Sequence, residues 1–271
     1  DYNRSVKLKN FPRWDYVILT ASNDQQAEGF RRQIEERKEY LPAGTRFAAI
    51  PDRGGERVGS GGATLEVLKY LHEQEGDFRK LRVLVIHSGG DSKRVPQYSA
   101  LGKLFSPVPH QLPDGRSSTL FDEFMICMSS MPSRIREGMV LLSGDVLLLF
   151  NPLQIDFYGK GAAALSIKEP AEIGKNHGVY RRDREGNVGG FLHKKTVEQL
   201  HEMGAVDEHG HVDIDTGAVM MSVDLLNSLY SLIDTEEKFA ACVNEQARLS
   251  FYADFLYPLC LLYTSPSPRD A

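Results

Sequence analysis

The chain has 271 residues, of which 41% are hydrophobic and 25% charged, and its formal net charge is −5. These proportions are ordinary for a globular protein, and a negative charge without a basic stripe argues against nucleic acid as the main partner. No apolar run approaches the roughly 20 residues that a membrane-spanning helix needs. No signal-peptide pattern opens the chain either, so we expect no membrane partner and a cytoplasmic location.

The pattern of apolar residues predicts strands that alternate with helices over the first half of the chain. Strands are expected at 15–21, 47–50, 83–87, 139–142 and 162–167, and helices at 24–40, 65–72 and 119–131. Such alternation is typical of an α/β domain with a mostly parallel sheet and helices on both faces. No internal repeat or low-complexity linker divides the chain. Three cysteines without metal-ligand spacing, Cys127, Cys242 and Cys260, are expected to be reduced thiols.

The segment after the predicted strand at 83–87 is the most informative part of the chain. It combines glycines with cationic side chains, in the order Gly89, Gly90, Lys93, Arg94, Gly102, Lys103. Glycines let backbone N–H groups approach an anion, a lysine supplies a point charge and an arginine a planar fork. The segment therefore predicts a nucleoside triphosphate site, although a glycine pair alone is more often a turn into a helix. It matches neither a Walker A loop nor the dinucleotide fingerprint.

A second glycine-rich segment, residues 59–64, contains Gly59, Gly61 and Gly62 and precedes the helix expected at 65–72. Free N–H groups and the positive end of the helix dipole could hold a phosphate there, or the face of a base. The alternative is a surface loop that caps the helix.

Asp145 follows Gly144 directly after the predicted strand at 139–142. Ligands bind outside the carboxyl ends of strands in open α/β sheets. Because Mg²⁺ is held by one or two carboxylates together with substrate phosphates, a single aspartate suffices as its anchor. Asp145 is therefore the predicted magnesium ligand; the alternative is a turn aspartate that caps the next element.

Three later positions suit a small phosphorylated ligand. His177 and Gly178 lie in a short apolar segment, and Lys194 follows in Phe191–Thr196. The alternative is a plain hairpin with surface lysines. Asp215, in the sequence Asp-Thr-Gly, is expected either to bind sugar hydroxyls or to end a strand.

Taken in order, these motifs resemble those of fucose-1-phosphate guanylyltransferases, also called GDP-L-fucose pyrophosphorylases. The motifs are GSGGAT (59–64), HSGGDSKRVPQYSALGKLF (87–105), SGDV (143–146), NHGVY (176–180), FLHKKT (191–196) and DTG (215–217). The likeness runs from about Trp14 to about Leu259. In this family the activity occurs as a stand-alone enzyme or as the amino-terminal half of a bifunctional fucokinase/pyrophosphorylase.

The resemblance implies a Rossmann-like, GT-A-like nucleotidyltransferase domain that forms GDP-L-fucose and pyrophosphate from GTP and L-fucose 1-phosphate with Mg²⁺. It implies that Gly89, Gly90 and Arg94 hold the triphosphate and that Lys103 is the lysine of the same loop. Asp145 matches the metal-binding aspartate of the family.

His177, Gly178 and Lys194 match segments around the sugar phosphate. Lys195-Thr196 departs from the Pro-Ser often found there and is expected to leave the loop of Lys194 less rigid.

Both ends of the chain look atypical. It starts at Asp1 rather than methionine, and residues 260–271 resemble a translated sequencing adapter. We expect residues 1–259 to be an incomplete nucleotidyltransferase domain, with the β-helix or kinase portion of the family missing. Two other functions stay open: transfer to another sugar or from another nucleotide, and a nucleotide-binding fragment that does not catalyse.

Overall fold

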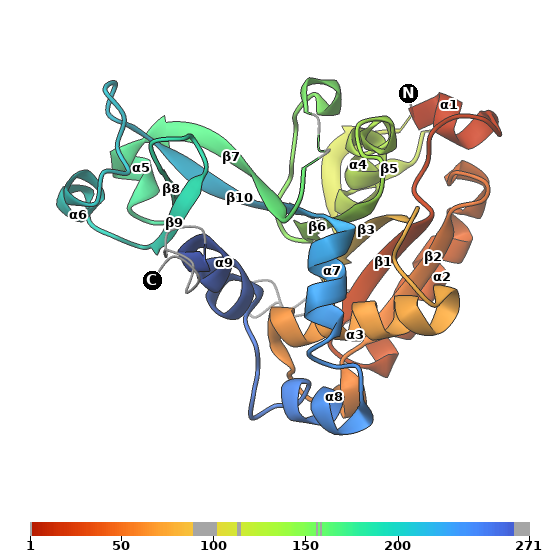
Figure 1. Ribbon diagram of the computed structural model, residues 1–271. Coiled ribbons are helices and arrows are strands. Elements are labelled where there is room, and N and C mark those ends of the chain that lie inside the picture. Colours follow the sequence, from red (N-terminus) through yellow and green to blue (C-terminus); the bar gives the residue numbers. More distant parts are fainter. Residues whose placement is uncertain (1, 89–101, 113–114, 156, 158, 263–271) are drawn as a thin grey trace. The chain divides into compact units, whose positions relative to one another are not determined.

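The computed structural model describes residues 2–88, 102–112, 115–155, 157 and 159–262 (Figure 1). The chain forms two compact units. The first unit comprises Asp1–Ala163 with Val219–Arg248, and the second unit comprises Ala164–Ala218 with Leu249–Ala271. Among the described residues, no helix is both long enough and apolar enough to cross a membrane.

A parallel sheet forms the centre of the first unit. Its strands are β1 (Tyr16–Ala21), β2 (Arg46–Pro51), β3 (Arg82–His87) and β6 (Gly138–Ser143), in the order β2-β1-β3-β6. The last residues of β10 (His211–Met221) pair antiparallel with β6. All six residues of β1 are buried, as expected for a strand covered on both faces. The predicted strands and the predicted parallel pairing are confirmed in this unit.

The strand order reverses between β1 and β3. The chain passes from β1 outward to β2, then returns across β1 to β3 and continues to β6. Helices on either side of such a reversal leave a crevice outside the carboxyl ends of the two strands, which is where open α/β sheets bind their ligands. A ligand-binding site is therefore expected outside the carboxyl ends of β1 and β3.

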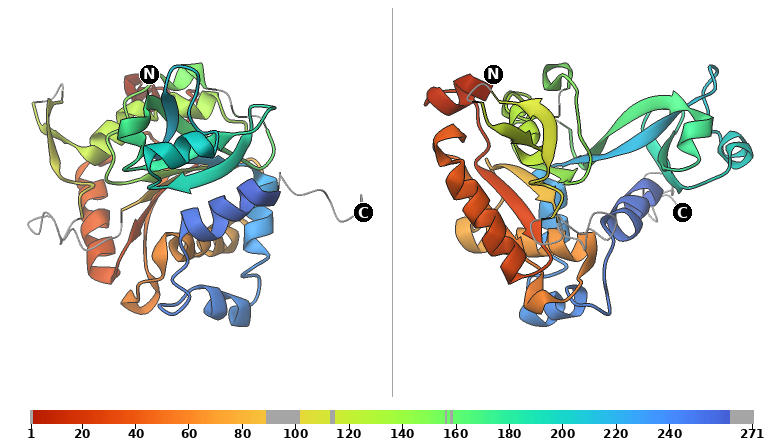
Figure 2. Two further views of the ribbon diagram at one scale, coloured as in Figure 1. Left: turned by 90° about the vertical axis from the view of Figure 1, so that its left-hand side faces the viewer. Right: turned by 180° about the vertical axis from the view of Figure 1, so that it is seen from behind.

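Two long helices cover this sheet, one on each face (Figures 1 and 2). Helix α2 (Asp24–Glu36) begins where the Asn23 side chain accepts a hydrogen bond from the Gln26 backbone N–H at 2.9 Å. A 3₁₀ turn (Lys38–Tyr40) follows it, so the helix predicted at 24–40 is confirmed up to Glu36. Helix α3 (Gly59–Glu75) ends at Gly76 in the left-handed conformation.

The glycine-rich segment at 59–64 is not a loop, because α3 already begins at Gly59. The prediction of a loop before the helix is therefore wrong at this point. Gly59 has a φ of 79°, which a side chain would disfavour. A Cβ atom on Gly62 would lie 2.8 Å from the Cβ of Val58, so this glycine allows close packing at the helix start.

The remaining elements of the first unit complete its outer layers. They are α1 (Tyr2–Lys7), β4 (Pro107–Gln111), β5 (Ser117–Thr119), α4 (Leu120–Cys127), α7 (Val223–Tyr230) and α8 (Glu236–Cys242). Helix α4 starts with a capping box between Thr119 and Asp122 and ends four residues before the predicted end at 131. Buried Asp122 also pairs with buried Arg37 at 3.0 Å, which ties α4 to the end of α2.

The second unit is built differently, around antiparallel pairing. Its elements are β7 (Ala162–Pro170), α5 (Ala171–Gly174), β8 (Gly178–Arg182), β9 (Val188–His193), α6 (Val197–Glu202), most of β10, a π-helical segment (Phe251–Leu256) and α9 (Tyr257–Leu262). Strand β8 pairs antiparallel with both β9 and β10.

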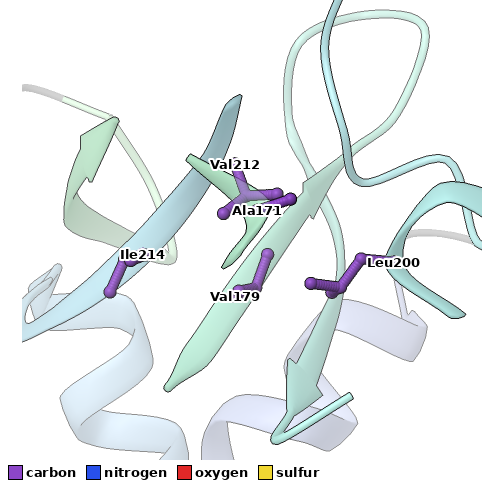
Figure 3. Close-up of a cluster of buried hydrophobic side chains, with 5 residues drawn as sticks. All are labelled: Ala171, Val179, Leu200, Val212 and Ile214. Atoms are coloured by element: carbon purple, nitrogen blue, oxygen red, sulfur yellow. The ribbon is translucent and has the colours of Figure 1, made fainter. Parts of the chain in front are cut away.

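A small hydrophobic core supports the second unit (Figure 3). It contains Ala171, Val179, Leu200, Val212 and Ile214. Because side chains alternate along a strand, the neighbours of Val179 and Ile214 point to the opposite face of the sheet. That opposite face carries Gly178 and Asp215, two of the residues singled out from the sequence.

Candidate functional site

The carboxyl ends of the parallel strands bring Asp145 next to the end of β3. The backbone N–H of Gly144 donates to the His87 carbonyl at 2.8 Å. A Cβ atom on Gly144 would lie 2.7 Å from that same carbonyl oxygen, so only glycine lets the chain after β6 approach β3 this closely. The sequence Gly144-Asp145 thus places a carboxylate beside the start of the predicted triphosphate segment.

Asp145 forms an ion pair with Lys103, with 3.1 Å between Nζ and Oδ2. The Ser143 hydroxyl donates to the other carboxylate oxygen at 2.8 Å. Partial burial raises the pKa of Asp145, but the Ser143 hydrogen bond and the Lys103 ammonium outweigh it and hold the pKa below its ordinary value. With 49% of its side chain exposed, Asp145 is an ionised carboxylate open to a ligand. The structure therefore brings together two residues that the sequence analysis selected separately.

Gly102, the residue before Lys103, lies close to the chain that follows β3, at the same edge of the sheet. It has a φ of 63°, and a Cβ atom there would lie 3.1 Å from the Ser88 carbonyl. Ser88 and Gly102, which precede and follow residues 89–101, are therefore neighbours in space. Gly89, Gly90, Lys93 and Arg94 lie outside the described residues, and their roles stay predictions.

His87, at the end of β3, links this edge to α3. Its Nδ1 lies 3.2 Å from the Thr20 hydroxyl and its Nε2 lies 3.1 Å from the Thr64 hydroxyl. Thr64 gives its one hydroxyl proton to the Ser60 carbonyl, so Nε2–H must donate to Thr64, and in a neutral ring Nδ1 then accepts from the Thr20 hydroxyl. Burial lowers the pKa of His87 to about 4, which keeps the ring neutral and leaves Nδ1 free to accept.

The sequence analysis missed His87, although a signal was present. A polar residue that ends an otherwise apolar strand, two residues before a glycine pair, is placed to support the chain beyond the strand. Through Thr64 the histidine fixes the early turns of α3, which contain Gly61 and Gly62. The predicted nucleotide-binding glycines of α3 and the end of β3 thus belong to one hydrogen-bonded assembly.

In the second unit, the hairpin β8–β9 joins His177, Gly178 and Lys194. Gly178 pairs with His193, and the Lys194 backbone N–H donates to the His177 carbonyl at 3.0 Å. Lys194 has a φ of 49°, a conformation that a non-glycine residue adopts rarely. The side chains of His177 and Lys194 are exposed.

Thr196, one of the departures from the family pattern, has a definite role beside this lysine. It starts α6 with a capping box, in which Thr196 and Gln199 exchange side-chain and backbone hydrogen bonds. The capping box holds the chain two residues after Lys194.

Asp215 lies within β10 and not at a turn. The strand runs on to Met221, with Gly217 at a φ of 76° in its interior, so the expectation that Asp215 ends a strand is wrong, and its binding of a sugar hydroxyl stays a prediction. Oδ1 of Asp215 accepts hydrogen bonds from the Tyr180 hydroxyl at 2.7 Å and from the Gly217 N–H at 3.0 Å. Burial raises the pKa of the Asp215 carboxyl above its ordinary value.

Gly178 lies opposite Asp215 and beneath the ring of Phe191. A Cβ atom on Gly178 would lie 2.4 Å from Cζ of Phe191 and 3.5 Å from Cβ of Asp215. Phe191 in turn stacks on Tyr252, with 5.7 Å between the ring centroids. This face of the second unit therefore combines a carboxylate with an aromatic surface, beside the exposed Lys194.

The first unit could hold a metal ion through Asp145. Among residues 2–88, 102–112, 115–155, 157 and 159–262, no three histidine, cysteine or acidic side chains cluster as a metal site. A single ionised carboxylate at the ligand edge of the sheet fits a Mg²⁺ ion that takes its other ligands from phosphate oxygens and water.

Comparison with known proteins agrees with this arrangement. The family model for the fucose pyrophosphorylase domain matches residues 76–267. The fucose-1-phosphate guanylyltransferases of Mus musculus and Homo sapiens are 33% and 31% identical to the chain, over 71% and 73% of its length. The bifunctional fucokinase/GDP-fucose pyrophosphorylase of Arabidopsis thaliana is 28% identical over 90% of the chain.

The chain spans only part of each of these relatives, namely 35% of the mouse and human proteins and 27% of the Arabidopsis protein. The match to the family model nevertheless covers well over half of the 271 residues. It includes Lys103, Asp145, Lys194 and Asp215. The chain therefore belongs to the fucose pyrophosphorylase family.

Proposed function

We propose that the chain transfers a guanylyl group from GTP to L-fucose 1-phosphate, forming GDP-L-fucose and pyrophosphate on a GT-A-like nucleotidyltransferase fold. The observation that carries the proposal is the ion pair of Lys103 and Asp145 at the carboxyl edge of a parallel sheet, in a chain of the fucose pyrophosphorylase family. The names of the mouse and human relatives specify fucose 1-phosphate and guanylyl transfer.

In this reaction an oxygen of the sugar phosphate attacks the α-phosphorus of GTP. The new P–O bond forms as the bond between the α-phosphorus and the bridging oxygen breaks, and pyrophosphate leaves with that oxygen. The attacking phosphate is already ionised at neutral pH, so no general base is needed. Positioning and neutralisation of charge then supply the catalysis.

The residues of the first unit would provide the charge. Lys103 lies with its ammonium group at the ligand edge and can neutralise a phosphate oxygen once Asp145 has another partner. We assign Arg94 the same kind of role from the sequence. Asp145 would hold Mg²⁺, which when bound offsets the negative charge of the phosphates. His87 and Thr64 would keep the start of α3 in place for the nucleotide.

The residues of the second unit would bind the sugar phosphate. Lys194 presents an exposed ammonium group for the phosphate, and Asp215 presents a carboxylate that can accept a hydrogen bond from a sugar hydroxyl. The strained backbone at Lys194 supports this assignment, because unfavourable dihedral angles are retained mainly where function requires them.

The test is a panel assay of the purified chain that scores pyrophosphate release. We expect release with GTP, L-fucose 1-phosphate and Mg²⁺, and loss of release when EDTA removes the metal. ATP or UTP in place of GTP, and galactose or glucose 1-phosphate in place of the fucose compound, should give slower release. Faster release with another pair would replace the proposed substrates, whereas binding of GTP without any release would show a nucleotide-binding module.

A second prediction concerns Lys194. Replacing it with alanine removes a charge-assisted hydrogen bond, a contact that typically contributes about 1.5–3 kcal/mol, or roughly 10- to 100-fold in affinity. We expect the KM for L-fucose 1-phosphate to rise by about that factor while the KM for GTP stays the same. Lys168→Ala, which removes another partly exposed lysine of the second unit, is the control. Equal effects of both replacements on the two KM values would contradict the assignment.

A further inference from the structure

One carboxylate in the second unit is held by more donors than a surface aspartate needs. Asp215 accepts hydrogen bonds from the Tyr180 hydroxyl, the Gly217 N–H and the Tyr252 side chain. The two tyrosines come from segments far apart in the sequence, β8 and the π-helical segment Phe251–Leu256. Such convergence fixes both the position and the rotation of the carboxylate.

The three donors still leave room for a ligand. An ionised carboxylate offers about four lone-pair positions, so about one stays open after three hydrogen bonds. Asp215 is only partly buried, whereas Tyr180 is 3% exposed and cannot itself reach a ligand. Tyr180 therefore acts only through its hydrogen bond to the carboxylate, from the buried side of Asp215.

The surroundings of Asp215 suit one face of a sugar. Phe191 lies over Gly178, the residue opposite Asp215 across the strands, and stacks on Tyr252. An aromatic surface beside a hydrogen-bond acceptor can contact the C–H groups of a sugar while the acceptor binds a hydroxyl. Lys194 follows His193, the partner of Gly178 in β9, and so belongs to the same end of the hairpin.

We propose that Tyr180 and Tyr252 are positioning residues that orient Asp215 to bind a sugar hydroxyl, so that together they set the affinity for the sugar part of the sugar phosphate. This inference rests on the function proposed above. It adds two residues to the predicted substrate site, and one of them comes from the segment that follows Arg248.

The direct test is Tyr180→Phe, which removes one oxygen atom from a buried ring. By calorimetry, we expect the Kd for L-fucose 1-phosphate to rise by about tenfold, the usual effect of one hydrogen bond to a charged group. The Kd for GTP and for inorganic phosphate should stay the same, because inorganic phosphate carries no sugar and the ribose of GTP is proposed to bind with the nucleotide at residues of the first unit. Asp215→Asn should produce the same pattern.

The matched control is Tyr16→Phe. Tyr16 is also a fully buried tyrosine in a strand, and its hydroxyl also donates to a carboxylate, that of Glu75. It lies at the amino end of β1 in the first unit, at the opposite end of the strand from the candidate nucleotide residues. We expect Tyr16→Phe to lower the melting temperature without changing any of the three Kd values.

A pH series separates positioning from a merely structural role. The Tyr180 hydrogen bond lowers the pKa of Asp215, so its removal should raise that pKa further. Sugar-phosphate binding requires the ionised carboxylate, so affinity for L-fucose 1-phosphate should fall as the pH is lowered through the pKa of Asp215. In Tyr180→Phe this fall should occur at higher pH. Among the described residues, the titratable side chains that act on the pKa of Asp215 are Tyr180 and Tyr252, with Cys260 acting on Tyr180, and none of these three titrates in acid. Ionisation of the ligand phosphate affects the unaltered chain and the variants equally, so it does not contribute to the difference between their pH profiles.

The outcomes are distinct. If the unaltered chain does not bind L-fucose 1-phosphate, the proposed function fails and this inference fails with it. If the unaltered chain binds and Tyr180→Phe binds equally well with the same pH profile, only the inference is overturned. Should Tyr180→Phe not fold, Tyr252→Phe removes the second hydroxyl from the same carboxylate and is expected to show the same loss of affinity.

Discussion

Replacement of Asp145 by alanine is expected to lower the rate of GDP-L-fucose formation by about 100-fold or more. The carboxylate is ionised and half exposed, and it lies at the edge of the parallel sheet. Lys103 pairs with it there, and the end of β3 lies beside the preceding Gly144. Its loss would leave Lys103 without its acidic partner and would remove the carboxylate proposed to hold Mg²⁺. Single-turnover measurement of pyrophosphate release at saturating GTP and sugar phosphate gives the chemical rate directly.

Asp234→Ala is the matched control for this experiment. Asp234 belongs to the same unit, is 43% exposed, and pairs with Lys238 at 2.6 Å, so it resembles Asp145 in exposure and in partner. It lies between α7 and α8 and not at the ligand edge, and its replacement should leave the rate unchanged. Asp145→Asn keeps the size of the side chain and removes the charge, and it should resemble Asp145→Ala. A rate within about threefold of the unaltered chain for Asp145→Asn, far short of the loss expected for an essential charge, would show that the carboxylate is not required.

Replacement of Gly138 by alanine is expected to have the largest effect on stability. Gly138 begins β6 with a φ of 126°, and a Cβ atom there would lie 2.4 Å from the Met221 carbonyl oxygen. The obstacle is backbone of the neighbouring strand, so no change of side-chain rotamer can relieve it. Backbone strain of about 1–3 kcal/mol and overpacking of about 1–3 kcal/mol together predict a loss of roughly 2–6 kcal/mol in the free energy of unfolding.

Thermal unfolding followed by circular dichroism measures this loss. For a chain of this size we expect the melting temperature to fall by roughly 4–24 °C. Two control glycines separate the causes. Gly159→Ala has nothing within 4 Å and no positive φ, and it should be neutral. Gly76→Ala has a φ of 79° with nothing within 4 Å, so it should show the conformational effect alone, about 1 kcal/mol. A melting temperature for Gly138→Ala no lower than that of Gly76→Ala would contradict the steric argument.

The strands of the first unit could be predicted because their signal is local. Residues 15–21 and 83–87 are short apolar runs bounded by polar residues, and buried strands of a parallel sheet have that appearance. The prediction for the glycine-rich start of α3 is wrong because glycine has low helix propensity. The propensity is overridden by the close packing of Gly62 against Val58, a contact that only the folded chain shows.

The candidate site divides in the same way. Lys103 and Asp145 could be selected from the sequence by residue type and local position. A cation after a glycine suits a phosphate, and a carboxylate after a strand suits magnesium. The contact between Lys103 and Asp145 could not be predicted, because 42 residues separate them in the sequence. It depends on the parallel pairing of β3 with β6 and on the approach of Gly102 to Ser88, which only the folded chain shows. The hydrogen bond of Tyr180 to Asp215 likewise depends on the antiparallel register of β8 and β10, which places Gly178 opposite Asp215.

Short stretches of the chain suffice to establish the class of the fold, the family and the residue types that suit a nucleotide and a sugar phosphate, because periodicity, glycine spacing and motif order are local properties. The folded chain is needed to show that α3 begins at Gly59, that His87 joins β3 to α3, and that two tyrosines converge on Asp215. These features arise from contacts between residues distant in the chain, whose geometry is set by strand register and packing and leaves no local trace in the sequence.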